Sequence, residues 1–142
     1  MKLVDANVLL YAINESDPRH DEARTWLDTS LSESETVGFT WITLLAFIRL
    51  VTRVGLFPRP LSTPEALAVV GAWLDQPSSL VVEPTTRHFD VLSGLLAQLG
   101  TAGNLVSDAH LAALAIEHHA IVVSYDRDFA RFAGVRVETP HR

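Results

Sequence analysis

The sequence predicts a three-layer α/β/α domain with a central parallel sheet of about five strands. Short apolar runs alternate with helical patterns along the whole chain, which is typical of a parallel sheet covered by helices. The length fits one domain over residues 1–142, and the 48% of apolar residues suffices for a buried core. In such folds the ligand site lies at the carboxyl ends of the strands, so the residues that follow each strand are the candidates for a site.

Five short apolar runs are the candidate strands. The first covers residues 2–4 and ends at Asp5, where polar residues lead into a helical run over residues 8–13. We expect this strand to be central in the sheet. The remaining strands are expected at residues 36–40, 80–83, 121–124 and 135–137.

Helical patterns fill the segments between the strands. Asp17 and Pro18 match an N-cap followed by proline at the first helical position, and predict a helix to about residue 31. The next helix, residues 41–54, is apolar nearly all round, which predicts burial on two sides, one of them available to another protein. Further helices are expected at residues 63–74, at residues 85–99 before a break at 100–103, and from the Asn104, Ser107 and Asp108 region to residue 119.

The composition excludes several classes of protein. The chain has no Cys, which excludes disulfides, thiolate metal sites and cysteine nucleophiles, and its net charge of −6 argues against binding nucleic acid by bulk charge. Asp5 falls where a signal peptide needs its apolar segment, and the longest uncharged stretch, residues 91–107, carries several polar residues, so we expect no membrane segment and a cytoplasmic location. The mean hydropathy of +0.20 indicates apolar surface that a partner covers.

Four aspartates fall where the predicted fold places a ligand site. Asp5 ends the first strand, Asp126 and Asp128 follow the fourth, and Asp108 opens the helix before that strand. Two carboxylates about 4 Å apart repel by roughly 4 kcal/mol at an effective dielectric constant near 20, so such a cluster takes up protons or holds a cation. A ligand set made only of oxygen atoms favours Mg²⁺ or Mn²⁺.

Each of these residues also has a purely structural interpretation. Asp5, Asn7 or Asp108 can simply cap a helix, and Asp126 and Asp128 fit an ordinary turn. Capping alone does not explain why all four aspartates fall at the same predicted sheet edge. We therefore favour the metal site.

Three sequence segments resemble the PIN domain, specifically the VapC toxins of toxin–antitoxin pairs. They are VDANVLLY at residues 4–11, GNLVSDAHLAALA at 103–115 and VSYDRDF at 123–129. The resemblance covers nearly the whole chain. It implies a PIN-like fold, a homodimer, a VapB-like antitoxin as partner, and transfer or ribosomal RNA as plausible substrates.

The resemblance also implies an activity and roles for individual residues. VapC toxins are magnesium-dependent endoribonucleases, in which a metal-activated water attacks an RNA phosphodiester. The resemblance assigns the catalytic metal ligands to Asp5, Asp108 and Asp126. It assigns supporting positions to Asn7, Asn104, Ser124 and Asp128.

One position departs from the family pattern. The family has a Glu in the helix after the second strand, within Thr-Leu-x-Glu-x-x-Arg, and Ala46 occupies that place in TLLAFIR at residues 43–49. Glu117 is a poor substitute because it lies nine residues after Asp108, on the opposite face of the same helix, where we expect a solvated surface residue. We expect three aspartates and water to hold one ion, since Mg²⁺ usually keeps several waters. A contribution from Asp128 and a weakened activity are the alternatives.

The candidates for RNA contact are arginines in two pairs, each one helical turn apart. Arg127 and Arg131 lie next to the predicted acidic site, while Arg49 and Arg53 lie on the apolar helix. Ion pairing with nearby acids is the alternative role for these side chains. The histidines and tryptophans show no spacing that requires a function, and we expect them at the surface or in the core.

Two further functions stay open. The first is a non-catalytic PIN-like scaffold or binding module for RNA or protein, which lost its chemistry with the Glu at Ala46. The second is a phosphohydrolase of the haloacid-dehalogenase type, suggested by Asp5-x-Asn7 but weakened because the second aspartate of its motif is missing.

Overall fold

The computed structural model describes residues 1–100 and 102–141 and contains one five-stranded sheet. All neighbouring strands are parallel, and the order is β3-β2-β1-β4-β5, so β1 is central as predicted. The strands are β1 (Lys2–Val4), β2 (Val37–Phe39), β3 (Ser79–Val81), β4 (Ile121–Val123) and β5 (Arg136–Glu138). The predicted α/β fold with a parallel sheet of about five strands is confirmed.

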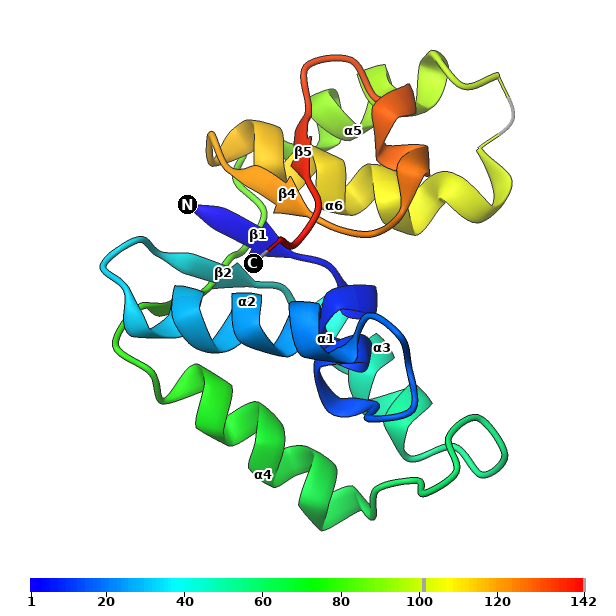
Figure 1. Ribbon diagram of the computed structural model, residues 1–142. Helices are drawn as coiled ribbons and strands as arrows, with labels where there is room; N and C mark the ends of the chain where they lie inside the picture. The colour runs from blue at the N-terminus through cyan, green and yellow to red at the C-terminus, as the bar shows by residue number, and fades with distance from the viewer. Residues whose placement is uncertain (101, 142) are drawn as a thin grey trace.

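Helices cover both faces of the sheet (Figure 1). One layer holds α1 (Ala6–Ile13), α2 (His20–Ser32), α3 (Trp41–Val51) and α4 (Thr63–Leu74), and the other holds α5 (His88–Ala97) and α6 (Val106–Glu117). Each layer has its own buried core, in which Leu9, Phe39 and Phe47 lie on one side of the sheet and Leu3, Leu114 and Phe129 on the other. Within the described part of the chain, no helix is long and apolar enough to cross a membrane.

Several helix boundaries differ from the prediction, and α5 covers only His88–Ala97 of the expected residues 85–99. The carboxylate of Asp17 accepts hydrogen bonds from the backbone and the guanidinium of Arg19, which holds a turn, and α2 begins only at His20. The apolar helix α3 ends at Val51. A short 3₁₀ turn, η1 (Gly103–Leu105), precedes α6, so that Asp108 lies inside the first turn of α6 and is not its N-cap. Thr101, within the expected break, lies outside the described residues.

Glu117 is buried, and the expectation of a solvated residue was wrong. It does lie on the face of α6 opposite Asp108, but that face packs against α5 and the segment before it. Glu117 Oε1 accepts hydrogen bonds from the backbone N–H (2.9 Å) and the hydroxyl (2.7 Å) of Thr85, and Oε2 lies 2.6 Å from His88 Nδ1. The other ring nitrogen of His88 lies 2.8 Å from Nδ1 of His110. Burial raises the pKa of Glu117, but the hydrogen bonds from Thr85 and His88 outweigh it and hold the pKa below its usual value.

Candidate metal centre

Asp5 is held at the carboxyl end of the central strand by two hydrogen bonds. One carboxylate oxygen accepts from the backbone N–H of Ala6 (2.8 Å) and caps α1, as the structural interpretation predicted. The other oxygen accepts from the hydroxyl of Ser124 (2.7 Å), which follows β4. Asp5 therefore caps α1 and also lies at the sheet edge where a site was predicted, so the two interpretations are compatible.

Ser124 and Asn7 connect Asp5 to the segment after β4. The Ser124 hydroxyl accepts from the amide of Asn7 (3.1 Å) and from the backbone N–H of Asp126 (2.9 Å). The side-chain oxygen Oδ1 of Asn7 accepts from the backbone N–H of Tyr125 (3.2 Å). These bonds fix the start of α1 against the turn that carries Asp126.

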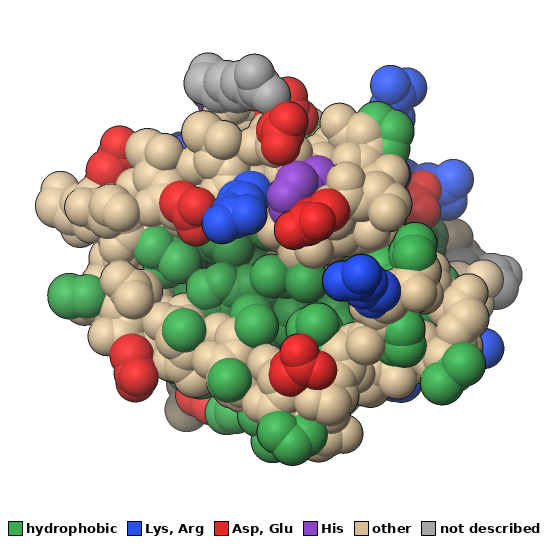
Figure 2. All heavy atoms as spheres, turned by 60° about the horizontal axis from the view of Figure 1, so that its bottom comes forward, with side chains coloured by type: hydrophobic (Ala, Val, Ile, Leu, Met, Phe, Trp, Pro, Cys, Tyr) green, Lys and Arg blue, Asp and Glu red, His purple; other side chains and the backbone are tan. Residues whose placement is uncertain are grey.

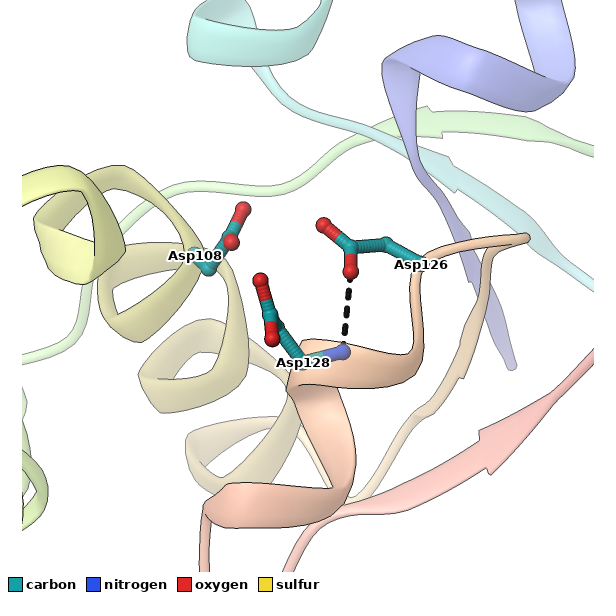
Figure 3. A group of neighbouring side chains, drawn as sticks. All are labelled: Asp108, Asp126 and Asp128. Atoms are coloured by element: carbon teal, nitrogen blue, oxygen red, sulfur yellow. Dashed lines mark hydrogen bonds between the residues drawn. The ribbon is translucent and has the colours of Figure 1, made fainter.

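Three more aspartates, Asp108, Asp126 and Asp128, come together at this edge of the sheet (Figure 3). Asp108 projects from the first turn of α6, while Asp126 and Asp128 belong to the turn after β4. Asp126 accepts from the backbone N–H of Asp128 (2.8 Å) and thereby caps the short 3₁₀ helix η2 (Arg127–Arg131). Asp108, Asp126 and Asp128 each offer one oxygen atom within 4.8 Å of the others.

Burial and mutual repulsion raise the pKa values at this edge of the sheet. The pKa of Asp108 rises to about 6, first because of burial and then because of the charges of Asp126, Asp5 and Asp128. Burial also raises the pKa of Asp5, and the charge of Asp126 adds to this, while the hydrogen bonds from Ser124 and Ala6 act in the opposite direction. Close carboxylates that resist ionisation gain most from a divalent cation, so these residues fit one.

Asp5 and Asp108 also line a cleft between α3 and α6. The cleft has a volume of about 410 Å³, and Ala46 and Arg49 of α3 border it. Ala46 therefore lies beside the acidic residues, at the place where the family pattern has its Glu, and brings no carboxylate to the site. The side chain of Arg49 is exposed there.

The other predicted residues lie further from the acidic group or make different contacts. Arg131 pairs with Asp128 at 3.6 Å, which is the alternative role expected for it. Arg127 is exposed and borders a second pocket together with Ser124 and Asp126. Asn104 is exposed in η1, and its side chain makes no hydrogen bond among the described residues.

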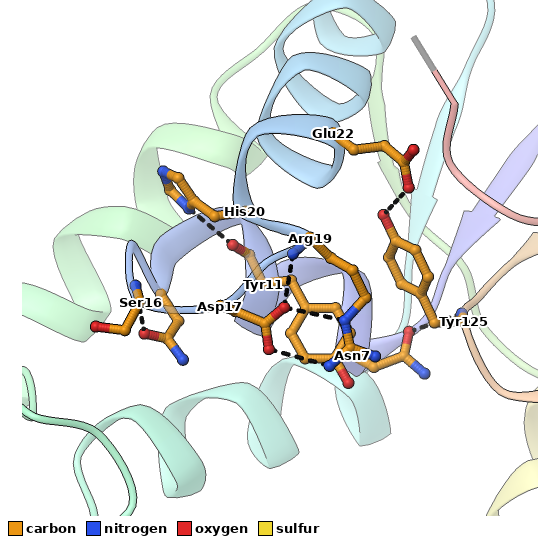
Figure 4. Close-up of polar contacts among 9 residues, drawn as sticks. Asn7, Tyr11, Ser16, Asp17, Arg19, His20, Glu22 and Tyr125 are labelled. Atoms are coloured by element: carbon orange, nitrogen blue, oxygen red, sulfur yellow. Dashed lines mark hydrogen bonds and ion pairs between the residues drawn. The ribbon is translucent and has the colours of Figure 1, made fainter.

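A cluster around Tyr125 next to the site was not predicted (Figure 4). The hydroxyl of Tyr125 donates to Glu22 of α2 (2.9 Å), and its ring meets the edge of the Tyr11 ring, with 5.2 Å between centroids. The guanidinium of Arg19 lies 3.7 Å from the Tyr11 centroid and pairs with Asp17. Burial and Glu22 raise the pKa of Tyr125, so it stays a neutral hydrogen-bond donor. Tyr11 and Tyr125 both lie in the segments that resemble the PIN domain. That resemblance was the sequence signal that could have pointed to this cluster.

Comparison with known proteins decides the family. A model of the PIN domain family matches residues 2–135. The chain belongs to the PIN domain family. Over 99% of its length it is 56% identical to ribonuclease VapC37 of Mycobacterium tuberculosis, of which it covers 97%. Over its whole length it is 39% identical to ribonuclease VapC33 of the same species, of which it covers 99%. The chain is therefore a VapC-type PIN domain protein, and the predicted resemblance is confirmed.

Solved structures of PIN domain proteins share the fold. The VapBC2 complex of Rickettsia felis, crystallised with a DNA fragment from its promoter, contains a chain with a TM-score of 0.72 at 19% identity, with 98% of both chains covered. VapC20 of M. tuberculosis, described as a toxin that cleaves the sarcin-ricin loop, has a TM-score of 0.65 at 20% identity over 96% of this chain and 99% of its own. At these identities the similarity establishes the fold of the VapC-type chain.

Proposed function

We propose that this VapC-type chain is a magnesium-dependent endoribonuclease and the toxin of a type II toxin–antitoxin pair, acting on RNA in the cytoplasm. The observation that carries the proposal is the group of Asp108, Asp126 and Asp128, with Asp5 beside it, at the carboxyl edge of a PIN domain sheet. Relatives named ribonuclease that match over nearly the full length support the reaction class. Oxygen ligands favour Mg²⁺, with Mn²⁺ as a substitute.

In the proposed mechanism Asp5, Asp108 and Asp126 would hold a metal, with Asp128 supporting them. Such a metal, when bound, would activate a water and neutralise charge on the phosphodiester. Ser124 and Asn7 orient Asp5 and the turn of Asp126, so that the ligands need little rearrangement. The exposed guanidinium groups of Arg127 and Arg49 are placed to contact RNA phosphates, which arginine binds through paired N–H donors. Asn104, which is exposed near the site, is assigned a supporting role only through the resemblance.

We also propose that a VapB-like antitoxin covers the apolar surface of the α4 side. Figure 2 looks onto this side and shows hydrophobic side chains gathered in a hollow that charged side chains border. Leu56 and Leu67, in the loop before α4 and in α4 itself, are about half exposed. A cleft lined in part by Ile13, Val51 and Phe57 opens beside that loop. Apolar surface of this kind is typical of a binding face for another protein.

The partner is tested by inhibition of the toxin. We expect a VapB-like antitoxin to inhibit RNA cleavage by wild type and to inhibit Leu67→Glu less well, because the new charge would be buried in the interface. Equal inhibition of both would place the partner elsewhere. The proposed homodimer is tested by light scattering on the antitoxin-free protein, where a monomer mass would contradict it.

A non-catalytic scaffold is the second candidate, and Ala46 is the observation that favours it. Cleavage of total RNA by the purified, antitoxin-free protein in Mg²⁺ or Mn²⁺ separates the two functions. We expect discrete fragments that disappear with EDTA and with Asp108→Asn and remain with Asp75→Asn, a change of an exposed aspartate at the end of α4. Cleavage that survives both EDTA and Asp108→Asn would come from a contaminating nuclease. No metal-dependent cleavage would favour the scaffold, and Ala46→Glu would then test whether the missing carboxylate is the cause.

A further inference from the structure

The cleft between α3 and α6 has two chemically different walls. Asp5 and Asp108 form its acidic end. The α3 wall consists of Ile42, Thr43, Leu45, Ala46 and Arg49, and all of these except Thr43 are spaced three, four and seven positions apart on one helix face. The cleft thus runs from the metal ligands onto an apolar surface.

The α6 wall and the rim add a few polar groups. Leu111 lies one helical turn beyond Ser107 and contributes apolar surface, while the Ser107 side chain is exposed. The exposed guanidinium of Arg49 stands at the rim. Polar and apolar residues line this cleft in equal parts, and its volume of about 410 Å³ falls within the roughly 300–1,000 Å³ of small-ligand sites.

We propose that this cleft binds an unpaired RNA base adjacent to the scissile phosphate, and that Ala46 keeps the cleft open for that base. The inference rests on the proposed ribonuclease function, which places the scissile phosphate at the acidic end. Proteins that read RNA sequence bind splayed-out bases against apolar or guanidinium surfaces and contact the base edges with polar groups. Ile42 and Leu45 offer the apolar surface, and Arg49 offers the guanidinium.

Ala46 is the residue that decides the space available. It is half-buried in the middle of the α3 wall, beside Asp5 and Asp108. A longer side chain at this position projects into the cleft, and a carboxylate there adds a negative charge beside the phosphate. The exposed guanidinium of Arg49 at the rim offers paired N–H donors to a phosphate or to a base edge.

The experiment combines protein variants in which a larger side chain at Ala46 fills the cleft with RNA substrates that lack a single base. The cleavage site is first mapped on total RNA, and a short oligoribonucleotide that spans it is prepared with normal bases and with single abasic nucleotides on either side of the scissile bond. Wild type, Ala46→Leu and the control Ala97→Leu, an exposed alanine at the end of α5, are compared by kcat/KM. Thermal denaturation verifies that each variant is folded, and Ala46→Val provides a smaller increase in volume.

We expect the abasic substitution at one of the two positions to lower kcat/KM of wild type by about tenfold, the scale at which one stacked base contributes to nucleic-acid binding. Ala46→Leu should lose a similar factor on the normal substrate and little more on the abasic one, because both changes remove the same contact. Ala46→Val should lose less, and Ala97→Leu should behave as wild type.

A second readout does not depend on turnover. In the non-cleaving Asp108→Asn background, 2-aminopurine at the sensitive position should change its fluorescence on binding, and adding Ala46→Leu should abolish the change. If the losses in kcat/KM caused by Ala46→Leu and by the abasic nucleotide multiply when the two changes are combined, the two changes act independently and the inference is overturned. So would an Ala46→Leu variant that cleaves normally but resists the antitoxin, which would make the cleft part of the partner interface. If wild type shows no metal-dependent cleavage, the proposed function itself fails.

Discussion

The Asp108→Asn substitution should stabilise the metal-free protein above pH 6. Burial and the neighbouring carboxylates raise the pKa of Asp108 from the ordinary value of 3.8 to about 6. Between these values the unfolded chain releases the proton while the folded chain keeps it. The folded state therefore loses stability as the pH rises from about 4 to about 6, and the loss is complete above that range. Asparagine stays uncharged over this pH range and therefore avoids this loss of stability.

The size of the effect follows from the pKa difference. A shift from 3.8 to about 6 corresponds to about 3 kcal/mol at most, at 1.36 kcal/mol per pH unit. Asp108 is only partly buried, and solvent screening reduces this to about 1–2 kcal/mol. For a chain of this length the melting temperature in EDTA should rise by about 3–6 °C.

The assay is thermal denaturation followed by circular dichroism in EDTA at pH 7.5 and pH 5. Wild type, Asp108→Asn and the control Asp75→Asn are compared. The advantage of Asp108→Asn should shrink at pH 5, and Asp75→Asn should melt like wild type. Saturating Mg²⁺ should raise the melting temperature of wild type more than that of Asp108→Asn, because a bound cation stabilises only a protein that can hold it. An Asp108→Asn variant no more stable than wild type at pH 7.5 would refute the reasoning.

Three further predictions concern individual hydrogen bonds at the site and on the opposite face of α6. Ser124→Ala should weaken Mg²⁺ binding about tenfold in calorimetric titration because Asp5 loses its hydroxyl donor, whereas Ser93→Ala should leave it unchanged. Glu117→Gln should lower the free energy of unfolding in urea by about 1–3 kcal/mol, because the substitution alters a buried acceptor of three hydrogen bonds. A variant as stable as wild type would contradict a stabilising role for the hydrogen bonds from Thr85 and His88. Tyr125→Phe should lower the free energy of unfolding in the same assay by about 0.5–1.5 kcal/mol, because the hydroxyl that donates to Glu22 is removed. An unchanged free energy of unfolding would mean that this hydrogen bond contributes nothing to stability.

Local patterns in the sequence were sufficient to predict the α/β architecture. The alternation of apolar runs and helical patterns predicted the parallel sheet and the central position of β1, because each period is set by a short stretch of backbone geometry. The rule that sites lie beyond the carboxyl ends of strands then selected the aspartates that follow β1 and β4. The PIN resemblance depended on the same segments and is confirmed by the family match.

Helix ends were predicted less well because competing local bonds decide them. Asp17 fits an N-cap by its type, but in the fold its carboxylate bonds to Arg19, whose guanidinium lies over the ring of Tyr11. The helix therefore begins later, at His20. The contact with Tyr11 spans eight residues and crosses the loop between α1 and α2, so helical periodicity does not predict it.

The sequence by itself determined the order of the elements, the parallel sheet and the sheet edge at which Asp5, Asp108, Asp126 and Asp128 lie. Only the tertiary structure decided that Asp108, Asp126 and Asp128 form the closest group among them, that Asp5 is bonded to Ser124, and that Glu117 is buried beneath His88. The physical reason is the range of the interactions. Helix and strand periods arise from neighbouring residues, whereas a buried carboxylate depends on which distant segment packs over it.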